Sequence, residues 1–327
     1  MQRTVALENV KPDGSSTTVD SLADTLMELL EEPPSSDNSF HSYKRNKSET
    51  ATKCFPLESD VDLKTISDFD LVRIAYEKSA PTLSWTEDKH VVRVSRNHVL
   101  KYGKGVLESE AKALKIASVE YGLNCPKVHR AFSLDEERSH FGTCGYILMD
   151  YIAGESLNDN WLFFPQREQA NIARQITEAI QKMQSISIKS RGPIGGGPYR
   201  GTFFPKPGVA AFASLSEMES WFEQKLAISK RLHQCPQDLP PMFKFNEFVL
   251  VHQNLNPDKI MIDETGTAWI VGWSNAGAYP PAFERAAIAA QENCKEFRNM
   301  MLQMLPEREV EEKQLAGLRF AVNAADY

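Results

Sequence analysis

The chain has 327 residues, of which 42% are hydrophobic and 25% charged, as in ordinary globular proteins, and it is long enough for one large or two small domains. The formal net charge of −7 argues against a general nucleic-acid-binding role, and no apolar stretch is long enough to span a bilayer. The first residues show no signal peptide, and the five cysteines contain no CxxC pair, so neither a zinc site nor a disulfide framework is indicated. We therefore expect a cytoplasmic protein with no nucleic-acid or membrane partner.

Residues 1–60 are expected to form a mostly disordered extension, because Ser, Thr, Pro and charged residues dominate there. A short amphipathic helix over residues 19–31 is the exception. Its apolar face consists of Val19, Leu22, Leu26, Leu29 and Leu30. Two interpretations remain open: the helix docks on its own domain, or it folds on contact with a protein partner.

The folded part is expected to begin near Ile66 with a small β-rich region. Residues 90–94 and 98–102 alternate in polarity around a turn, which predicts a hairpin, and a helix is expected over residues 110–119. Residues 126–132 and 146–149 read as further strands. Lys101 ends the hairpin and Glu110 opens the helix, but a Lys and a Glu nine residues apart indicate by themselves only a surface pair.

The second half of the chain is predicted to be mainly helical. Apolar residues at helical spacing predict helices over 166–183, over 216–233 with a capping box of Ser216 and Glu219, and over 281–305. The glycines of residues 192–197 are interpreted as a loop and not as a phosphate cradle, because no strand precedes them and no Lys-Ser/Thr pair follows.

One stretch of the chain carries the most specific pattern. An apolar run ends at His252, a polar loop follows, and apolar runs at 260–262 and 268–271 indicate a strand, a loop and two more strands. Within it lie His252-Gln253-Asn254, then Lys259, then Gly272-Trp273-Ser274.

This arrangement resembles the aminoglycoside phosphotransferase family, in the version common in fungi, which has a protein-kinase-like fold. The family usually has His-Gly-Asp, an Asn five residues after the Asp, and Asp-Trp-Glu after the next strand, whereas this chain has Asn254, Lys259 and Gly272 at the Asp, Asn and Asp positions. The resemblance implies a two-lobed α+β fold, with a small antiparallel N-lobe over residues 61–150 and a larger helical C-lobe over residues 151–327.

The resemblance also implies roles for individual residues. Asn254 takes the position of the catalytic base beside His252, and Lys259 and Gly272 take the metal-ligand positions, so that no metal is expected. A Lys on a strand paired with a Glu on the next helix positions phosphates in kinases. The residues expected to bind a nucleotide are Lys101, Glu110, Lys259 and the hinge residues Met149, Asp150, Tyr151 and Ile152.

Two functions follow from these substitutions. The first is a pseudokinase-like protein that binds a nucleotide, a small molecule or a protein partner, in the cleft or through the N-terminal helix, without normal Mg-dependent phosphoryl transfer. The alternative is an atypical ATP-dependent phosphotransferase that acts on a small hydroxylated molecule, with Lys259 partly replacing the metal. ATP or another nucleotide is the expected cofactor, and Mg²⁺ is not expected.

Overall fold

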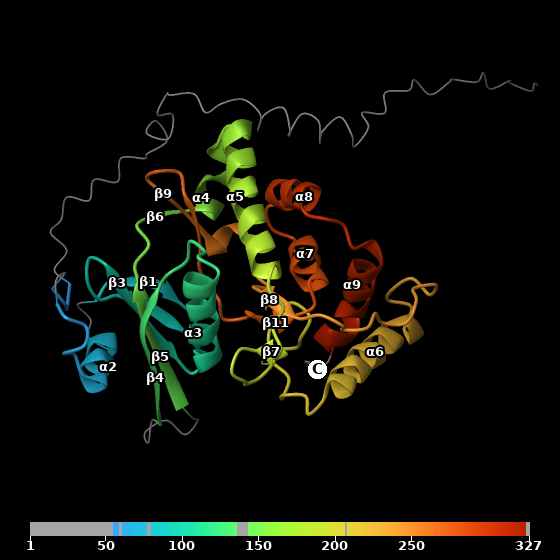
Figure 1. Cartoon of the computed structure of the whole chain (residues 1–327), viewed down its shortest axis with the longest axis horizontal. Coiled ribbons are helices and arrows are strands. Elements are labelled where there is room, and N and C mark those ends of the chain that lie inside the picture. Colours follow the sequence, from blue (N-terminus) through green and yellow to red (C-terminus); the bar gives the residue numbers. More distant parts are fainter. Residues whose placement is uncertain (1–54, 59–60, 77–79, 136–142, 207, 325–327) are drawn as a thin grey trace, which may run out of the picture. The chain divides into compact units, whose positions relative to one another are not determined.

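A computed structural model describes residues 55–58, 61–76, 80–135, 143–206 and 208–324 (Figure 1). The chain divides into two compact units, Met1–Ser36 and Asp37–Tyr327, and every described residue belongs to the second. The predicted helix over residues 19–31 therefore lies outside the described residues. Ordered contacts begin before Ile66, because the backbone N–H of Leu57 donates to the carbonyl of Val94 at 2.9 Å.

A five-stranded antiparallel sheet forms the first part of this unit, with the strand order β1-β2-β3-β5-β4. Its strands are β1 (Thr82–Trp85), β2 (His90–Arg93), β3 (His98–Gly103), β4 (Val128–Asp135) and β5 (Thr143–Asp150). The predicted hairpin is confirmed as β2 and β3, with His90 opposite Tyr102. Side chains alternate between the two faces of a strand, so Leu100 packs with helix α2 (Asp68–Tyr76) while Lys101 faces helix α3 (Glu108–Lys115).

The rest of the unit is mainly helical, as predicted. Its helices of more than one turn are α5 (Gln166–Gln184), α6 (Leu215–Arg231), α7 (Ala282–Ala289), α8 (Lys295–Met304) and α9 (Glu309–Asn323), and a single turn, α4, spans Leu157–Asn160. Two small sheets have the orders β10-β9-β6 and β7-β11-β8. Their strands are β6 (Gly154–Ser156), β7 (Gly192–Pro193), β8 (Val249–Val251), β9 (Ile260–Asp263), β10 (Ala268–Ile270) and β11 (Gly277–Tyr279). The helix over 166–183 and the strand-loop-strand pattern around His252 are thus confirmed.

The single helix predicted over residues 281–305 is wrong. The chain leaves α7 after Ala289 and begins α8 at Lys295, and Cys294 between them has a left-handed backbone with φ 50°. A regular helix cannot continue through such a residue. Helix α9, which the pattern of apolar residues did not indicate, follows α8 and packs against α6.

The predicted capping box of Ser216 and Glu219 is also wrong. Ser214 caps α6 by accepting the backbone N–H of Glu217 at 3.1 Å, and the carboxylate of Glu217 accepts the N–H of Ala213. The spacing Ser-x-x-Glu occurs twice here, two residues apart. Glu219 instead accepts the backbone N–H of Phe245 at 2.9 Å, so only tertiary contacts distinguish the two candidates.

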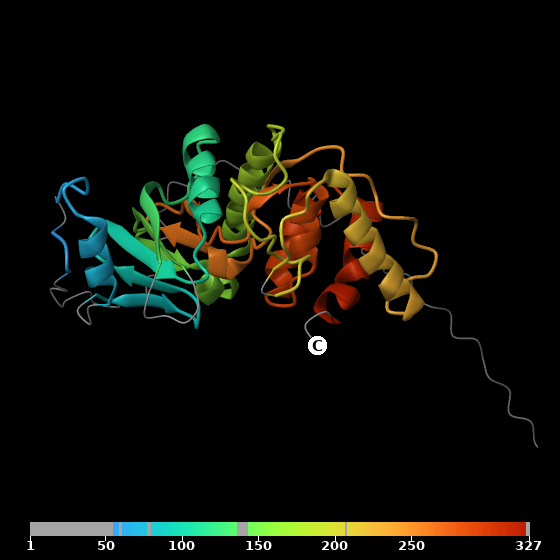
Figure 2. The same ribbon diagram turned by 90° about the horizontal axis from the view of Figure 1, so that it is seen from below.

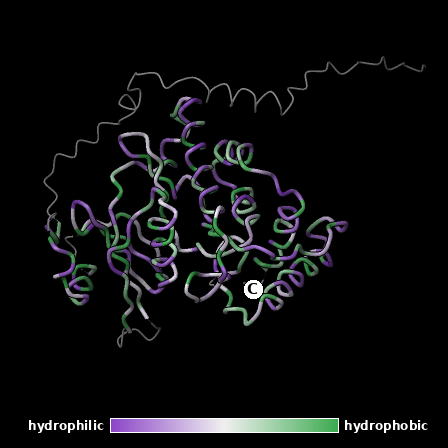
Figure 3. Tube along the Cα trace, in the orientation of Figure 1, coloured by the Kyte–Doolittle hydropathy of each residue, from purple (hydrophilic) through white to green (hydrophobic). Residues whose placement is uncertain are grey.

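Two large apolar clusters hold the helical part together. One joins α5 and α8 to β8, β9 and β10, and the other surrounds Phe222 and Phe283 between α6, α7 and α9. Hydrophobic and hydrophilic positions alternate along the helices in Figure 3, as expected of elements that bury one face. Figures 1 and 2 show the five-stranded sheet with α2 at one end of this unit, and α6 and α9 at the other. Among the described residues, no helix combines the length and apolarity that a membrane crossing needs.

Candidate functional site

The loop that follows β8 covers residues 252–259 and is here called the active loop. It begins at His252, which is fully buried. Its Nδ1 accepts the backbone N–H of Asn254 at 3.3 Å, so the ring proton is on Nε2, which donates to the carbonyl of Val271 at 3.2 Å. The ring packs edge-on against Trp273, with 4.8 Å between centroids. Burial lowers the pKa of His252 to about 3. A neutral imidazole with both nitrogens engaged orients the loop and is poorly suited to accept a substrate proton.

Glu284 of α7 supports the active loop from its buried side. Its carboxylate accepts the backbone N–H groups of His252 at 2.5 Å and Gln253 at 3.2 Å. Burial raises the pKa of Glu284 to about 7, although the two N–H groups act in the opposite direction. Sequence reasoning missed this residue, and its one available signal was a carboxylate in a helix whose other residues, apart from Arg285, are apolar.

Gln253 occupies the position at which the family usually has glycine, and the structure shows why glycine suits it. Its φ is 61°, in the left-handed region. The side chain is fully buried and its Nε2 donates to the carbonyls of Arg200 at 3.3 Å and Asn275 at 3.2 Å. The Thr202 hydroxyl donates to the Gln253 carbonyl at 3.0 Å. Gln253 therefore ties the loop after the glycine-rich segment to the active loop.

Asn254 is the residue predicted to stand at the position of the catalytic base. Its Oδ1 accepts a hydrogen bond from Nδ2 of Asn256 at 2.9 Å, and Oδ1 of Asn256 in turn accepts the backbone N–H of Asp258 at 2.9 Å. An uncharged amide has no lone pair basic enough to take a proton at neutral pH. Asn254 can orient a hydroxyl group, but it cannot deprotonate one.

Lys259 and Gly272, which the resemblance assigns to two ligand positions of one metal, lie side by side. The backbone N–H of Val271 donates to the carbonyl of Lys259 at 2.9 Å. An ideal Cβ built on Gly272 would lie 2.6 Å from Cδ of Lys259, so the lysine side chain fills the space that a residue-272 side chain would need. Gly272 also has φ +77°, which disfavours most other residues.

Lys101 and Glu110 form a buried ion pair, with 2.5 Å between Nζ and Oε1. Their side chains are only 8% and 2% exposed, which sets them apart from ordinary surface pairs. Two cations that sequence reasoning missed lie nearby. Burial and then the charge of Lys101 lower the pKa of Lys89. The guanidinium of Arg200 donates to the carbonyl of Gly105 at 3.1 Å.

The charges of Lys259 and Lys101 both act to lower the pKa of His252, so the two ammonium groups lie within electrostatic reach of the same buried ring. Of the predicted base and metal positions, none carries a carboxylate. The nearest acidic side chains along the loop are those of Asp258 and Asp263. Asp258 is exposed, and the Asp263 carboxylate is bound by Thr265, Thr267 and Trp269.

The hinge residues span the end of β5, with Met149 and Asp150 inside the strand and Tyr151 and Ile152 after it. Met149 pairs with both neighbouring strands, the N–H of Asp150 donates to the Lys127 carbonyl at 3.1 Å, and the N–H of Tyr151 donates to the Asn97 carbonyl at 2.7 Å. Within the described part of the chain, the carbonyl of Tyr151 and the N–H of Ile152 have no hydrogen-bond partner. Unpaired backbone groups of this kind are what a flat base would need.

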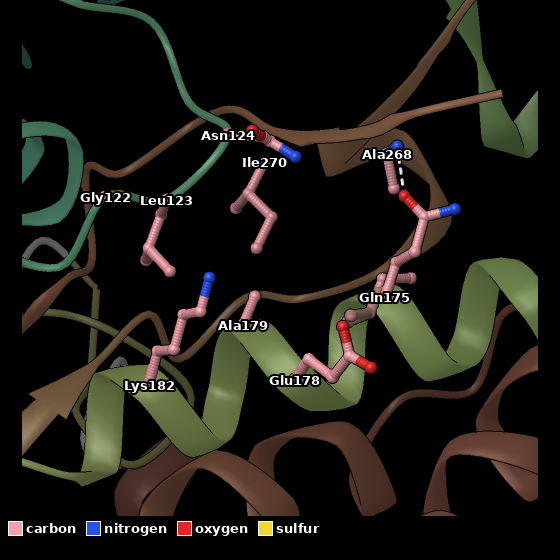
Figure 4. Close-up of a pocket in the computed structure, with 10 residues that line it drawn as sticks. Gly122, Leu123, Asn124, Gln175, Glu178, Ala179, Lys182, Ala268 and Ile270 are labelled. Carbon is pink, nitrogen blue, oxygen red and sulfur yellow. Dashed lines mark hydrogen bonds between the residues drawn. The ribbon is translucent and has the colours of Figure 1, made fainter. Parts of the chain in front are cut away.

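A pocket of about 140 Å³ lies elsewhere, between α5, β10 and the segment Gly122–Asn124 (Figure 4). Gln175 crosses it from α5 and accepts the backbone N–H of Ala268 at 2.9 Å. Lys182 and Glu178 add charge to its lining. None of the predicted site residues lines this pocket, so it is separate from the candidate site.

Comparisons with known proteins address the family and the fold of this chain. The phosphotransferase enzyme family, APH, matches residues 83–318. The wild-type aminoglycoside 2'-phosphotransferase-IIIa in its GDP complex is 14% identical, with a TM-score of 0.51, over 74% of this chain and 82% of that one. A thermostable mutant of aminoglycoside phosphotransferase APH(4)-Ia in its apo form is 15% identical, with a TM-score of 0.49, over 74% and 84% of the two chains. A search of curated proteins finds no significant match.

The structural similarity confirms the predicted fold class, a two-lobed, kinase-like α+β fold. The family match begins within β1 and ends within α9, and so spans most of the chain and every predicted site residue. The chain therefore belongs to the phosphotransferase enzyme family.

Proposed function

We propose that this protein is a degenerate phosphotransferase that binds a nucleotide, or another small molecule or a protein partner, without normal Mg-dependent phosphoryl transfer. One observation carries the proposal: the side chain of Lys259 lies against Gly272, in the space where a second metal-binding carboxylate would project. A cation at that position repels Mg²⁺ and attracts phosphate oxygens.

The energetic consequences of the substitutions support this proposal. Loss of a general base typically costs about 10²–10⁴-fold in rate, and loss of a metal ion removes several more kcal/mol of charge stabilisation. Phosphoryl transfer depends mainly on positioning and charge neutralisation, so few other groups compensate. Because Asn254, Lys259 and Gly272 all depart from the family pattern, both functions are lost together.

An anionic ligand of the nucleotide class fits the residues that remain. The buried pair of Lys101 and Glu110 supplies an ammonium group held by a carboxylate, and Lys259 supplies a second cation. Nucleotide phosphates carry charge that these groups neutralise, and the hinge offers backbone groups to a base. We place this ligand between an N-lobe of residues 61–150 and a C-lobe of residues 151–327. The glycine-rich loop at 192–197 favours the fungal version of the family.

A second candidate function is slow, metal-free phosphoryl transfer from ATP to a small hydroxylated molecule. It is favoured by the ammonium group of Lys259, which forms no ion pair with any carboxylate in the described part of the chain. Such a free cation is available to neutralise charge on a transferring phosphate in place of a metal. Formation of ADP in the presence of EDTA and an acceptor would favour this candidate over the first.

Nucleotide binding with and without Mg²⁺ tests the proposal. ATP, ADP and GDP are titrated into the full chain by calorimetry, in EDTA and in Mg²⁺. We expect affinities that are equal within about 2-fold in the two conditions, and a loss of about 10-fold or more for Lys259→Met, because 10-fold corresponds to about 1.4 kcal/mol of charge interaction. Lys189→Met, at an exposed lysine, is the matched control. Binding that requires Mg²⁺ and tolerates Lys259→Met would contradict the proposal.

A protein partner bound through residues 19–31 is the remaining alternative. A chain without residues 1–54 separates it from cleft binding, since all the described site residues are retained. Unchanged nucleotide affinity with loss of a partner would assign the two activities to different parts of the chain.

A further inference from the structure

Three side chains of types that can bind a metal lie together at one end of the five-stranded sheet. His98 begins β3, Asp150 ends β5, and His129 lies near the start of β4. One potential ligand atom from each side chain lies within 4.8 Å of the other two. Because β5 is hydrogen-bonded to both β3 and β4, the carboxylate is flanked by the two imidazoles. The cysteine pattern of the sequence did not indicate such a site.

The ladder directs these side chains towards one another. His98 and Asp150 are direct partners across β3 and β5, and side chains of directly opposed residues lie on the same face. The pairing of β4 with β5 shifts register between Val128 and Arg130, which makes His129 the bulged residue. A bulge re-aims a side chain relative to a regular strand. The rings of His98 and His129 are 4.9 Å apart and nearly perpendicular.

Outer contacts hold the three ligands in place. Asp150 accepts the backbone N–H of Lys127 on Oδ2 at 3.1 Å, which leaves Oδ1 facing Nε2 of His129 at 2.6 Å. Nδ1 of His98 lies 2.9 Å from Oγ of Ser95, which also accepts the backbone N–H groups of Asn97 at 3.2 Å and His98 at 3.1 Å. The Ser95 hydroxyl therefore donates to Nδ1, and binding of a metal at Nε2 requires the ring proton to move to Nδ1 and the hydroxyl to turn away.

We propose that His98, His129 and Asp150 form a binding site for a divalent transition-metal cation of the Zn²⁺ type. Two imidazoles and a carboxylate, with an open position for water, are a donor set that Zn²⁺ accepts. Tetrahedral ligands at ordinary zinc distances are separated by roughly 3.3 Å, and the present spacings lie on both sides of that value. Binding needs a modest widening of the contact between His129 and Asp150, and a shift of the His129 ring proton to Nδ1.

The cluster is distinct from the phosphate-binding residues, because Lys101 projects from the opposite face of β3. A bound cation would join the ends of three strands immediately before the hinge residue Tyr151.

Zinc titration of the full chain, after treatment with EDTA and buffer exchange, tests the proposal. We expect one Zn²⁺ to bind per chain, and His129→Gln and Asp150→Asn to weaken binding at least about 10-fold. Both variants retain hydrogen-bonding groups, so the sheet is expected to fold, which circular dichroism verifies. His233→Asn is the matched control, because it removes an exposed imidazole and Asn tolerates the φ of 55° at that position.

X-ray absorption at the zinc edge identifies the ligands independently. Scattering from nitrogen and oxygen at about 2.0–2.1 Å is expected, with none from sulfur near about 2.3 Å. Mg²⁺ should not compete, because it prefers oxygen ligands. Absence of stoichiometric Zn²⁺ binding, equal binding by all variants, or a sulfur shell would each overturn the proposal.

Discussion

The two halves of the candidate site differ in what has been retained. The retained half is the buried ion pair of Lys101 on β3 and Glu110 on α3, which has the charges and burial expected of a phosphate-positioning pair. The altered half is the loop after β8, where Asn254, Lys259 and Gly272 stand at the positions at which the resemblance leads us to expect acidic and amide groups. The loop is held by backbone contacts to His252 and Glu284. The comparison teaches that the form of the loop depends on backbone hydrogen bonds to two buried side chains, and not on the charges at positions 254, 259 and 272.

The largest effect on stability is expected from breaking the ion pair of Lys101 and Glu110, the retained half. Lys101→Met leaves Glu110 buried without its partner, which typically costs about 3–5 kcal/mol of unfolding free energy. Urea denaturation measures the change, and adding Glu110→Leu to the same chain should recover part of it. Lys112→Met, which removes an exposed pair with Glu108 in the same helix, should cost less than about 1 kcal/mol. Equal losses of unfolding free energy in Lys101→Met and Lys112→Met would show that the buried pair contributes no more than an exposed one.

Glu284, which supports the active loop, is expected to make the free energy of unfolding depend on pH. Glu284 has a folded-state pKa of about 7, against 4.5 for the ordinary carboxyl group. The folded state therefore binds the proton more tightly, and the stabilisation is fully present below about pH 4.5 and is lost as pH rises through about 7. The difference corresponds to roughly 3 kcal/mol.

Unfolding free energies of the parent chain and Glu284→Gln, measured from pH 4.5 to pH 8, isolate this group. The parent chain should lose stability relative to the variant as pH rises, because the variant cannot ionise. Parallel curves would mean that Glu284 ionises normally in the folded state.

A smaller effect, on ATP affinity, is expected from placing the family's acidic and amide residues at positions 254, 259 and 272 of the altered half. The triple variant Asn254→Asp, Lys259→Asn, Gly272→Asp should gain Mg²⁺-dependent ATP binding, by about 10-fold between Mg²⁺ and EDTA. Lys259→Asn must accompany Gly272→Asp, because the lysine Cδ lies where the new Cβ would be placed. The left-handed backbone at residue 272 adds about 1–2 kcal/mol of strain. The melting temperature is therefore measured with the binding, and a folded variant without any Mg²⁺ effect would contradict this prediction.

The smallest effect is expected at the N-terminus of α6, which holds none of the predicted site residues. Ser214→Ala removes the cap of α6 and should cost about 1 kcal/mol of unfolding free energy. Ser216→Ala, inside the same helix, should change stability by less than about 0.5 kcal/mol, since no cap is lost. The same urea measurement ranks the two, and the reverse order would restore the capping box expected from the sequence.

Local patterns in the sequence were sufficient for the hairpin, helix α5 and the strand-loop-strand around His252, because alternation and helical spacing report directly on which face is buried. The spacing of His252, Asn254, Lys259 and Gly272 within one loop was likewise visible in the sequence, together with the missing carboxylates. The site roles proposed for these residues remain predictions.

Tertiary structure alone decided the rest. The cap of α6 depended on which glutamate Phe245 engages, and the break before α8 depended on the left-handed backbone of Cys294. Glu284 supports His252 from 32 positions away, and His98 and Asp150 meet only because β3 pairs with β5. Such contacts join residues distant in sequence, and no local propensity encodes them, since their energy arises only when burial and hydrogen bonding place the partners together.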